Sequence, residues 1–174
     1  MFLTILMLIV ITQRLIELLV AKENEKWIVQ QGGYEVGASH YPLMILLHSS
    51  FFIIFILEVI LFERTLSPLW GFFLILFLLA QVGRFWCLFS LGKFWNTKIM
   101  ILPNVNVVKK GPYKFLRHPN YLIVALELLT LPLLFNAYFT AIIFTLLNIW
   151  MLSIRIPIEE KALRELTNYS DAFH

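Results

Sequence analysis

Residues 2–21 read FLTILMLIVITQRLIELLVA, and their composition indicates a membrane-spanning helix. A helix needs about 20 mostly apolar residues to cross the roughly 30 Å hydrocarbon core of a bilayer. The stretch has that length and contains only two charged residues, Arg14 and Glu17. No basic segment precedes it and no small-residue cleavage site follows it, so we expect a retained span rather than a signal peptide.

The composition of the whole chain points the same way. Of its 174 residues, 60% are hydrophobic and 14% are charged, and the mean hydropathy is +0.80. Soluble domains average roughly 45–50% apolar and about 25% charged residues, and one domain of this size cannot hide the apolar excess in a single core. The composition therefore excludes a soluble monomer, a disordered chain and a coiled coil. A single cysteine, Cys87, excludes an internal disulfide.

Four further hydrophobic runs follow, at about 42–62, 69–91, 119–135 and 137–154. Only Asn136 separates the last two, so we expect a tight helical hairpin with Pro132 kinking or ending its first helix. The sequence predicts an all-α integral membrane helical bundle of about five transmembrane helices, in a single domain over residues 1–174. Three N-terminal helices (1–91) precede a polar loop, the hairpin and a polar tail (92–174).

Lys and Arg residues are distributed unevenly between the two ends of the predicted bundle. Eleven of the 14 lie in residues 22–41, in residues 92–118 and from residue 155 onward, whereas the opposite loops hold only Arg64. Because cytoplasmic loops are rich in Lys and Arg, we expect the N-terminus outside and the C-terminus inside the cell. The net charge of +3 then reflects topology and contact with anionic lipid. We expect no nucleic-acid partner.

Five charged side chains fall inside the predicted spans, and charges in a bilayer are costly enough to be functional candidates. Arg14 and Glu17 are three residues apart and can pair on one helix face. Arg84 could pair with Glu127 or face a polar cavity, and Glu58 could reach outward past the nearby end of its span. No histidine has a partner at metal-ligand spacing, so we expect no metal site.

The densest polar segment, residues 103–121, reads PNVNVVKKGPYKFLRHPNY and directly precedes the fourth span. Pro119 can occupy the first turn of that helix, where its missing N–H costs nothing. His118, Asn120 and Tyr121 would then surround a helix N-terminus, whose free N–H groups and partial positive charge suit an anionic or hydroxyl-rich ligand. A basic loop that only anchors the chain at the membrane surface is the alternative interpretation.

A second polar cluster, SIRIPIEEKALREL over residues 153–166, leaves the fifth span. Arg155 and Glu159 are four residues apart, on one helix face, and Pro157 between them should bend the helix or free the carbonyl of Ser153. Since both clusters flank one hairpin on the same side, we expect them to converge. An amphipathic cytoplasmic helix with solvated charges is the alternative.

The two motifs GPYKFLRHPNYL and RIPIEEKAL, one hydrophobic hairpin apart, resemble the isoprenylcysteine carboxyl methyltransferase (ICMT) family of integral membrane methyltransferases in its compact bacterial form. The resemblance covers roughly residues 95–170. It implies a bacterial cell membrane location and S-adenosylmethionine as methyl donor, bound from the cytoplasm between the hairpin and the preceding loop. The cofactor-binding residues that it implies are Val105, Asn106, Val107, Val108, Tyr113, His118, Pro119, Asn120, Tyr121, Glu159 and Glu160.

The resemblance also assigns Arg155 to the acceptor, as the catalytic and substrate-binding residue. Residue types at 105–108 depart from the eukaryotic pattern, so backbone contacts to the cofactor are expected there. Methyl transfer from a sulfonium neutralises charge, and a dry site with fixed geometry favours it. Arg155 would orient an anionic acceptor, and Glu159 would hold the ammonium or ribose of the cofactor. The expected acceptor is a lipophilic carboxylate or acidic hydroxyl, isoprenylcysteine-like or alkylpyrone-like, that enters sideways from the lipid.

Three other functions stay open on the sequence. A phospholipid N-methyltransferase would place an arginine awkwardly beside a primary amine. A membrane reductase of the sterol-reductase type is similar around RHPNY and would bind NADPH, with Lys109, Lys110 and Lys114 available for the 2′-phosphate. A non-catalytic membrane subunit or transporter component, for which Arg84 and Glu127 are the best support, would bind no cofactor.

Overall fold

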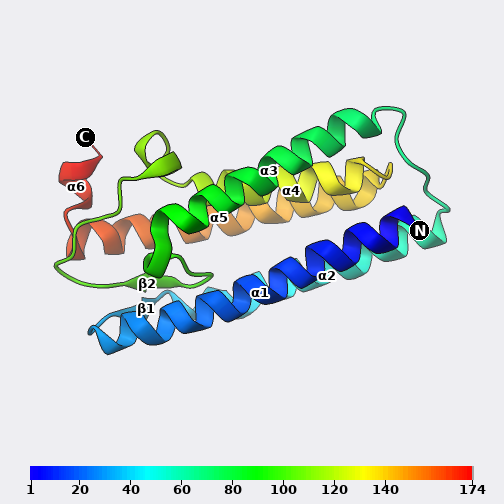
Figure 1. Ribbon diagram of the computed structural model, residues 1–174. Coiled ribbons are helices and arrows are strands. Elements are labelled where there is room, and N and C mark those ends of the chain that lie inside the picture. Colours follow the sequence, from blue (N-terminus) through cyan, green and yellow to red (C-terminus); the bar gives the residue numbers. More distant parts are fainter. Residues whose placement is uncertain (174) are drawn as a thin grey trace.

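Five helices run alongside one another in the computed structural model, which describes residues 1–173 (Figure 1). A short sixth helix, α6 (Tyr169–Ala172), ends the described chain. This architecture confirms the predicted all-α membrane helical bundle. The five main helices are α1 (Phe2–Gln30), α2 (Tyr41–Leu61), α3 (Trp70–Leu91), α4 (Pro119–Leu133) and α5 (Tyr138–Leu166).

Four segments are long and apolar enough to cross a membrane, namely Phe2–Gln30, Ala38–Leu61, Trp70–Phe94 and Tyr138–Leu166. Helix α4 has only 15 residues, about 22 Å at 1.5 Å per residue. The predicted fourth span ran to residue 135, but the chain already turns there. Pro132 lies in the last turn of α4, and Asn136 adopts a left-handed φ of 56°. The hairpin is therefore as tight as expected, with a shorter first helix.

Two of the helices are longer than their predicted spans. Helix α1 continues from residue 21 to Gln30, and α5 continues from residue 154 to Leu166. Hydropathy marks only the apolar part of a helix, whereas the backbone hydrogen bonds continue into the polar segment that follows. The second polar cluster is thus an extension of α5, and Pro157 lies within this helix without ending it.

A small antiparallel sheet joins two of the polar connections. Strand β1 (Tyr34–Val36), between α1 and α2, pairs with β2 (Ile99–Ile101), between α3 and α4. Three 3-10 helices, η1 (Ala38–His40), η2 (Gly92–Phe94) and η3 (Gly111–Lys114), complete these connections. The sequence did not predict the sheet, because three-residue strands are too short to show an alternating pattern.

The polar connections gather at one end of the bundle, together with α6 (Figure 1). The N-terminus and the α2–α3 and α4–α5 connections lie at the opposite end (Figure 1). The three segments that hold most of the Lys and Arg residues therefore share one end, as the charge pattern predicted.

The main apolar core draws buried side chains from all five helices, including Val10, Phe51, Phe77, Leu131 and Phe144. The rings of Phe51 and Phe144 meet edge to face with centroids 5.4 Å apart, a favourable aromatic geometry. Large apolar side chains such as Leu19 and Phe72 are exposed on the outside of the bundle. Because lipid tails are as apolar as these residues, close packing rather than removal from water stabilises the association of the helices.

Glu58 corrects one expectation about the intramembrane charges. Its side chain does not reach outward past the end of its span; it is 3% exposed and turns toward the first turn of α5. Its carboxylate accepts hydrogen bonds from the backbone N–H and the hydroxyl of Thr140, both at 2.7 Å, and pairs with Arg64. A carboxylate at a helix N-terminus satisfies free N–H groups and the positive end of the helix dipole. Glu58 therefore fastens α2 to the α4–α5 hairpin.

Candidate active site

Two neighbouring cavities lie toward the polar end of the bundle. The larger, of about 420 Å³, is lined by residues from all five main helices and by the segment that leads into β2. The smaller, of about 140 Å³, lies between the 105–108 segment, the end of α5 and the C-terminal tail. Seven residues line both cavities and so form the wall between them: Leu91, Phe94, Met100, Tyr113, Arg117, His118 and Glu159.

Most of the cofactor-binding residues implied by the sequence motifs line these cavities. Asn120 and Tyr121 line the larger one only. Pro119 and Glu160 line neither cavity. Pro119 begins α4, as expected, and Glu160 bonds to His118. The members found at the smaller cavity are Val105, Asn106, Val107, Val108, Tyr113, His118 and Glu159.

A hydrogen-bonded chain connects the two polar motifs. The Nε of Arg155 donates to the hydroxyl of Tyr121 at 2.8 Å, and this hydroxyl donates to Glu159 Oε2. Arg155 and Glu159 project from one face of α5, as their spacing predicted, and Tyr121 joins them from α4. The two motifs therefore converge at the mouth of the hairpin.

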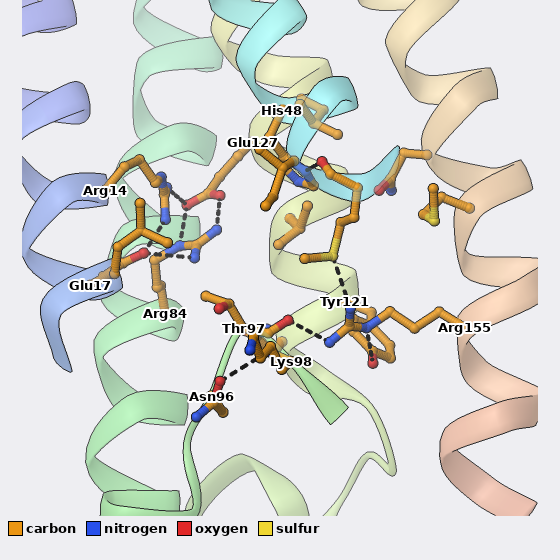
Figure 2. A pocket seen from close by; sticks show the side chains of 18 of the residues that line it. Arg14, Glu17, His48, Arg84, Asn96, Thr97, Lys98, Tyr121, Glu127 and Arg155 are labelled. Atoms are coloured by element: carbon orange, nitrogen blue, oxygen red, sulfur yellow. Dashed lines mark hydrogen bonds and ion pairs between the residues drawn. The ribbon is translucent and has the colours of Figure 1, made fainter. Parts of the chain in front are cut away.

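Arg155 is only 4% exposed, and two further contacts fix its guanidinium (Figure 2). Its Nη2 donates to the carbonyl oxygen of Thr97 at 2.6 Å, and its Nη1 points at the thioether sulfur of Met44 at 2.9 Å. A thioether is a weak acceptor, so Nη1 has a poor partner on the side of the larger cavity. Neither Thr97 nor Met44 was predicted, because a backbone carbonyl and an apolar side chain carry no sequence signal for this role.

His118 and Glu160 form a support at the start of α4. The Nε2 of His118 lies 3.2 Å from Glu160 Oε1, and its ring stacks on that of Tyr121 with centroids 5.4 Å apart. Glu160 also accepts from Arg164 at 2.6 Å and from the hydroxyl of Tyr169 at 3.3 Å. These contacts hold the His118 ring against the wall that the two cavities share.

Tyr113 lies in the wall that separates the two cavities. Burial, together with the neighbouring Cys87 thiol, raises the pKa of Tyr113 above its usual value. The phenol therefore stays protonated near neutral pH and can donate a hydrogen bond, but it cannot serve as a base.

The C-terminal tail folds over the smaller cavity and was not predicted as part of the site. Thr167, Tyr169 and Phe173 line this cavity. The side chain of Asn168 accepts a hydrogen bond from the backbone N–H of Val107 at 2.8 Å. Burial beside Glu160 raises the pKa of Tyr169 to about 12, so this hydroxyl remains a hydrogen-bond donor. The tail thus fixes the conformation of the 105–108 segment.

The intramembrane charges form a network that borders the larger cavity (Figure 2). Arg14 pairs with Glu17 at 2.6 Å, and Arg84 pairs with Glu127 through two nitrogens, one of them Nε at 2.8 Å. Both predicted pairs are confirmed. Cross-links also join them, since Arg14 reaches Glu127 at 2.9 Å and Arg84 reaches Glu17 at 3.1 Å. Gln81 adds a further hydrogen bond to Glu127.

Arg84 was expected either to pair with Glu127 or to face a polar cavity, and it does both. The network connects α1 to α3 and α4 with two positive and two negative groups. Buried charges are tolerated in hydrocarbon only when they are paired in this way.

The bundle and its converging motifs define a class, a small helical membrane protein with two adjoining cavities at one end. The sequence profile of the isoprenylcysteine carboxyl methyltransferase (ICMT) family matches residues 73–165, a stretch that includes both motifs. The chain belongs to this family of membrane methyltransferases.

Two relatives extend the similarity to the N-terminal helices. The uncharacterized protein YpbQ of Bacillus subtilis (strain 168) is 47% identical over 161 residues, which cover 92% of this chain and 96% of that protein. An uncharacterized protein of Haemophilus influenzae (strain ATCC 51907) is 27% identical over 171 residues, 95% of this chain and 97% of that protein. No solved structure matches the chain.

Proposed function

We propose that this protein transfers a methyl group from S-adenosylmethionine to an acidic oxygen of a lipophilic acceptor. The observation that carries the proposal is the Arg155–Tyr121–Glu159 chain. It lies between the smaller cavity, which the 105–108 segment and the C-terminal tail border, and the larger cavity, and so would contact both proposed ligands.

The residues at the smaller cavity fit the proposed cofactor chemically. Glu159 offers a carboxylate for the ammonium group or the ribose hydroxyls, and Tyr113 offers a hydroxyl donor. At the adjoining larger cavity, Oδ1 of Asn120 is buried without a hydrogen-bond partner within residues 1–173, and a cofactor donor that extends there would satisfy it. Ligand pockets usually measure about 300–1,000 Å³. A volume of about 140 Å³ is smaller than that, so the cofactor would extend past Tyr113 and Glu159 into the larger cavity.

We assign the larger cavity to the acceptor. Three apolar residues that line it, Leu15 and Leu18 of α1 and Ile45 of α2, are also exposed on the outside of the bundle. Residues that are both exposed and cavity-lining mark an opening, and these three would face lipid. An acceptor with a long apolar chain could thus enter from the bilayer and keep that chain in hydrocarbon.

The bound cofactor supplies a sulfonium methyl group, an electrophile that needs no acid or base from the protein. Arg155 would bind the anionic oxygen of the acceptor through Nη1, since a carboxylate or enolate is a far better partner than the Met44 thioether. Tyr121 and Thr97 hold the guanidinium in one orientation, which keeps the oxygen in line for displacement. The apolar walls of the larger cavity exclude water from the reacting oxygen.

We further propose that the polar end of the bundle faces the cytoplasm of a bacterial cell and that the N-terminus lies outside. The Lys and Arg distribution supports this orientation. A cytoplasmic site would also meet the donor, which is a cytoplasmic metabolite. The arrangement supports one domain over residues 1–174, because α1 and α2 provide walls of the same cavity as α4 and α5.

Structural observations make the competing functions less favourable. Lys109 donates to the carbonyl oxygen of Ala172, so one of the three lysines that a reductase would need for NADPH is already engaged. The buried Arg155 beside the larger cavity would oppose a cationic phospholipid amine.

Calorimetry on detergent-purified protein would test the cofactor first. We expect S-adenosylhomocysteine to bind with micromolar affinity and NADPH not to bind. Incubation with labelled S-adenosylmethionine and a total bacterial lipid extract should then label a lipid. When the product is a methyl ester, base should release the label as methanol, whereas acid should leave the label on the lipid. Binding of NADPH alone, or of neither ligand, would refute the proposed function.

A further inference from the structure

The larger cavity has a second polar region besides Arg155. Arg14 of α1, His48 of α2 and Asn148 of α5 all line it, and we call these three residues the inner polar group. Asn148 precedes Arg155 by seven residues, so it lies two turns away on the same face of α5, at an axial distance of about 10 Å. Figure 2 shows Arg14 and His48 on one side of the pocket and Tyr121 and Arg155 on the other.

Asn148 is the first member that points to a ligand. Its side chain is 2% exposed, lines the cavity and makes no hydrogen bond with any other residue of the described chain, 1–173. A buried amide without a partner is unfavourable unless a ligand or water satisfies it. Because its neighbours along the cavity, Met151 and Leu152, are apolar, the amide is not part of a general polar lining.

His48 offers an acceptor in the same region. Its Nδ1 lies 2.8 Å from the carbonyl oxygen of Met44. A carbonyl can only accept, so Nδ1 carries the proton, and Nε2 of the neutral ring is left as an acceptor. Nε2 has no hydrogen-bond partner within residues 1–173.

Arg14 offers donors. Its side chain is 21% exposed, whereas that of Arg84 is 7% exposed. Nη1 and Nη2 of Arg14 bond to Glu17 and Glu127, and these carboxylates neutralise its charge. A second anion would be repelled by them, whereas a neutral oxygen could accept an N–H of Arg14 without that cost.

Resting on the methyl transfer proposed above, we propose that the inner polar group binds a hydroxyl of the acceptor, separate from the oxygen that is methylated. A hydroxyl matches the three residues better than other neutral groups, because it can donate to His48 while it accepts from Arg14 or Asn148. The acceptor class is then a hydroxylated lipophilic acid, with its acidic oxygen at Arg155 and its hydroxyl deeper in the bundle. The ion-pair network of Arg14, Glu17, Arg84 and Glu127 joins the helices without hydrogen bonds to His48 or Asn148, so joining the helices does not explain these two residues.

Saturated fatty acids provide the test. Hexadecanoic acid would be compared with a series of hydroxyhexadecanoic acids that carry the hydroxyl at successive positions. Binding to the protein in the presence of S-adenosylhomocysteine, and kcat and KM for methyl transfer, would be measured for each. We expect one isomer to bind at least about tenfold more tightly than hexadecanoic acid, the effect of one well-made hydrogen bond to a buried group, with the gain in KM rather than in kcat.

Two variants identify the residues responsible. Asn148→Leu, which keeps the branched shape and the number of heavy atoms, and His48→Phe should each remove the preference for the hydroxylated isomer, so that its affinity relative to that of hexadecanoic acid falls to about one. Thr145→Val is the matched control, since Thr145 lies one turn away on α5 and lines neither cavity; it should keep the preference.

The outcomes separate this inference from the proposed function. If no isomer binds better than hexadecanoic acid, or if Asn148→Leu and His48→Phe weaken both ligands equally, the inference is wrong even though methyl transfer proceeds. If S-adenosylhomocysteine does not bind and no acid is methylated, the proposed function itself fails.

Discussion

The Nε of Arg155 donates a 2.8 Å hydrogen bond to the hydroxyl of Tyr121. This bond joins α5 to α4 at the point where the two cavities meet, and the same Tyr121 hydroxyl donates a hydrogen bond to Glu159. A single phenol thus orients both the residue proposed for the acceptor and the residue proposed for the cofactor.

Replacement of Tyr121 by Phe tests this bridge. We expect kcat/KM for methyl transfer to fall about tenfold to hundredfold, because Arg155 and Glu159 each lose a fixed hydrogen-bond partner. Tyr138→Phe is the control, since its exposed side chain lies at the far end of the bundle, where its hydroxyl bonds to Asn136. Radiometric assay of both variants would measure the difference. Equal activity of the two variants would contradict the bridging role.

Replacement of Glu159 by Gln tests the cofactor contact. A hydrogen bond to a charged group contributes about 1.5–3 kcal/mol, so the Kd for S-adenosylhomocysteine should rise roughly tenfold to hundredfold. Glu165→Gln removes a carboxylate six residues further along the same helix, where the side chain is exposed. Titration calorimetry should find no change for Glu165→Gln. A similar loss in both variants would indicate a general charge effect instead.

The intramembrane network predicts a large stability effect. Within residues 1–173, Arg84→Met leaves Glu127 and Glu17 to share Arg14 as their cationic partner, and breaking a buried ion pair costs about 3–5 kcal/mol. Unfolding in mixed detergent micelles would measure the loss. In the double variant Arg84→Met/Glu127→Leu the loss should be smaller than the sum of the two single losses, because no uncompensated carboxylate remains at position 127. Lys26→Met, at an exposed pair, should change the free energy of unfolding by less than about 0.5 kcal/mol.

Asn168→Ala tests the contact between the tail and the 105–108 segment. The Val107 N–H would lose its partner, so the segment should become less ordered and the affinity for S-adenosylhomocysteine should fall about threefold to tenfold. Asp171→Ala, an exposed change in α6, is the matched control. Faster amide exchange at Val107 in Asn168→Ala alone would support this explanation. Unchanged affinity would show that the tail does not act through this bond.

Much of the fold follows from the sequence because a bilayer leaves few options for an apolar chain. Apolar run length located the helices, and the four-residue spacing predicted that Arg155 and Glu159 share a face. The three-residue gap likewise predicted the Arg14–Glu17 pair. These features depend on local geometry, which a sequence specifies directly.

Features that depend on packing between distant segments could not be predicted from the sequence. Glu58 turned inward because the start of α5 lies beside it, and Thr97 contributes a carbonyl oxygen that any residue could have provided. Asn148 and His48 are polar residues within largely apolar stretches of sequence, and the structure places both in the lining of one cavity. Their shared location follows from how α2 and α5 pack, and no spacing rule predicts it.

The unequal lengths of α4 and α5 determine how far into the membrane the chemistry would occur. Helix α5 extends eleven residues beyond Arg155 to Leu166, about 16 Å, while α4 begins at Pro119, only two residues before Tyr121. The site is therefore recessed from the polar end of the bundle. Substrate and product would belong to a single leaflet, and neither would need to flip across the bilayer. Turnover would then follow the surface density of the acceptor in that leaflet rather than its concentration in bulk solution.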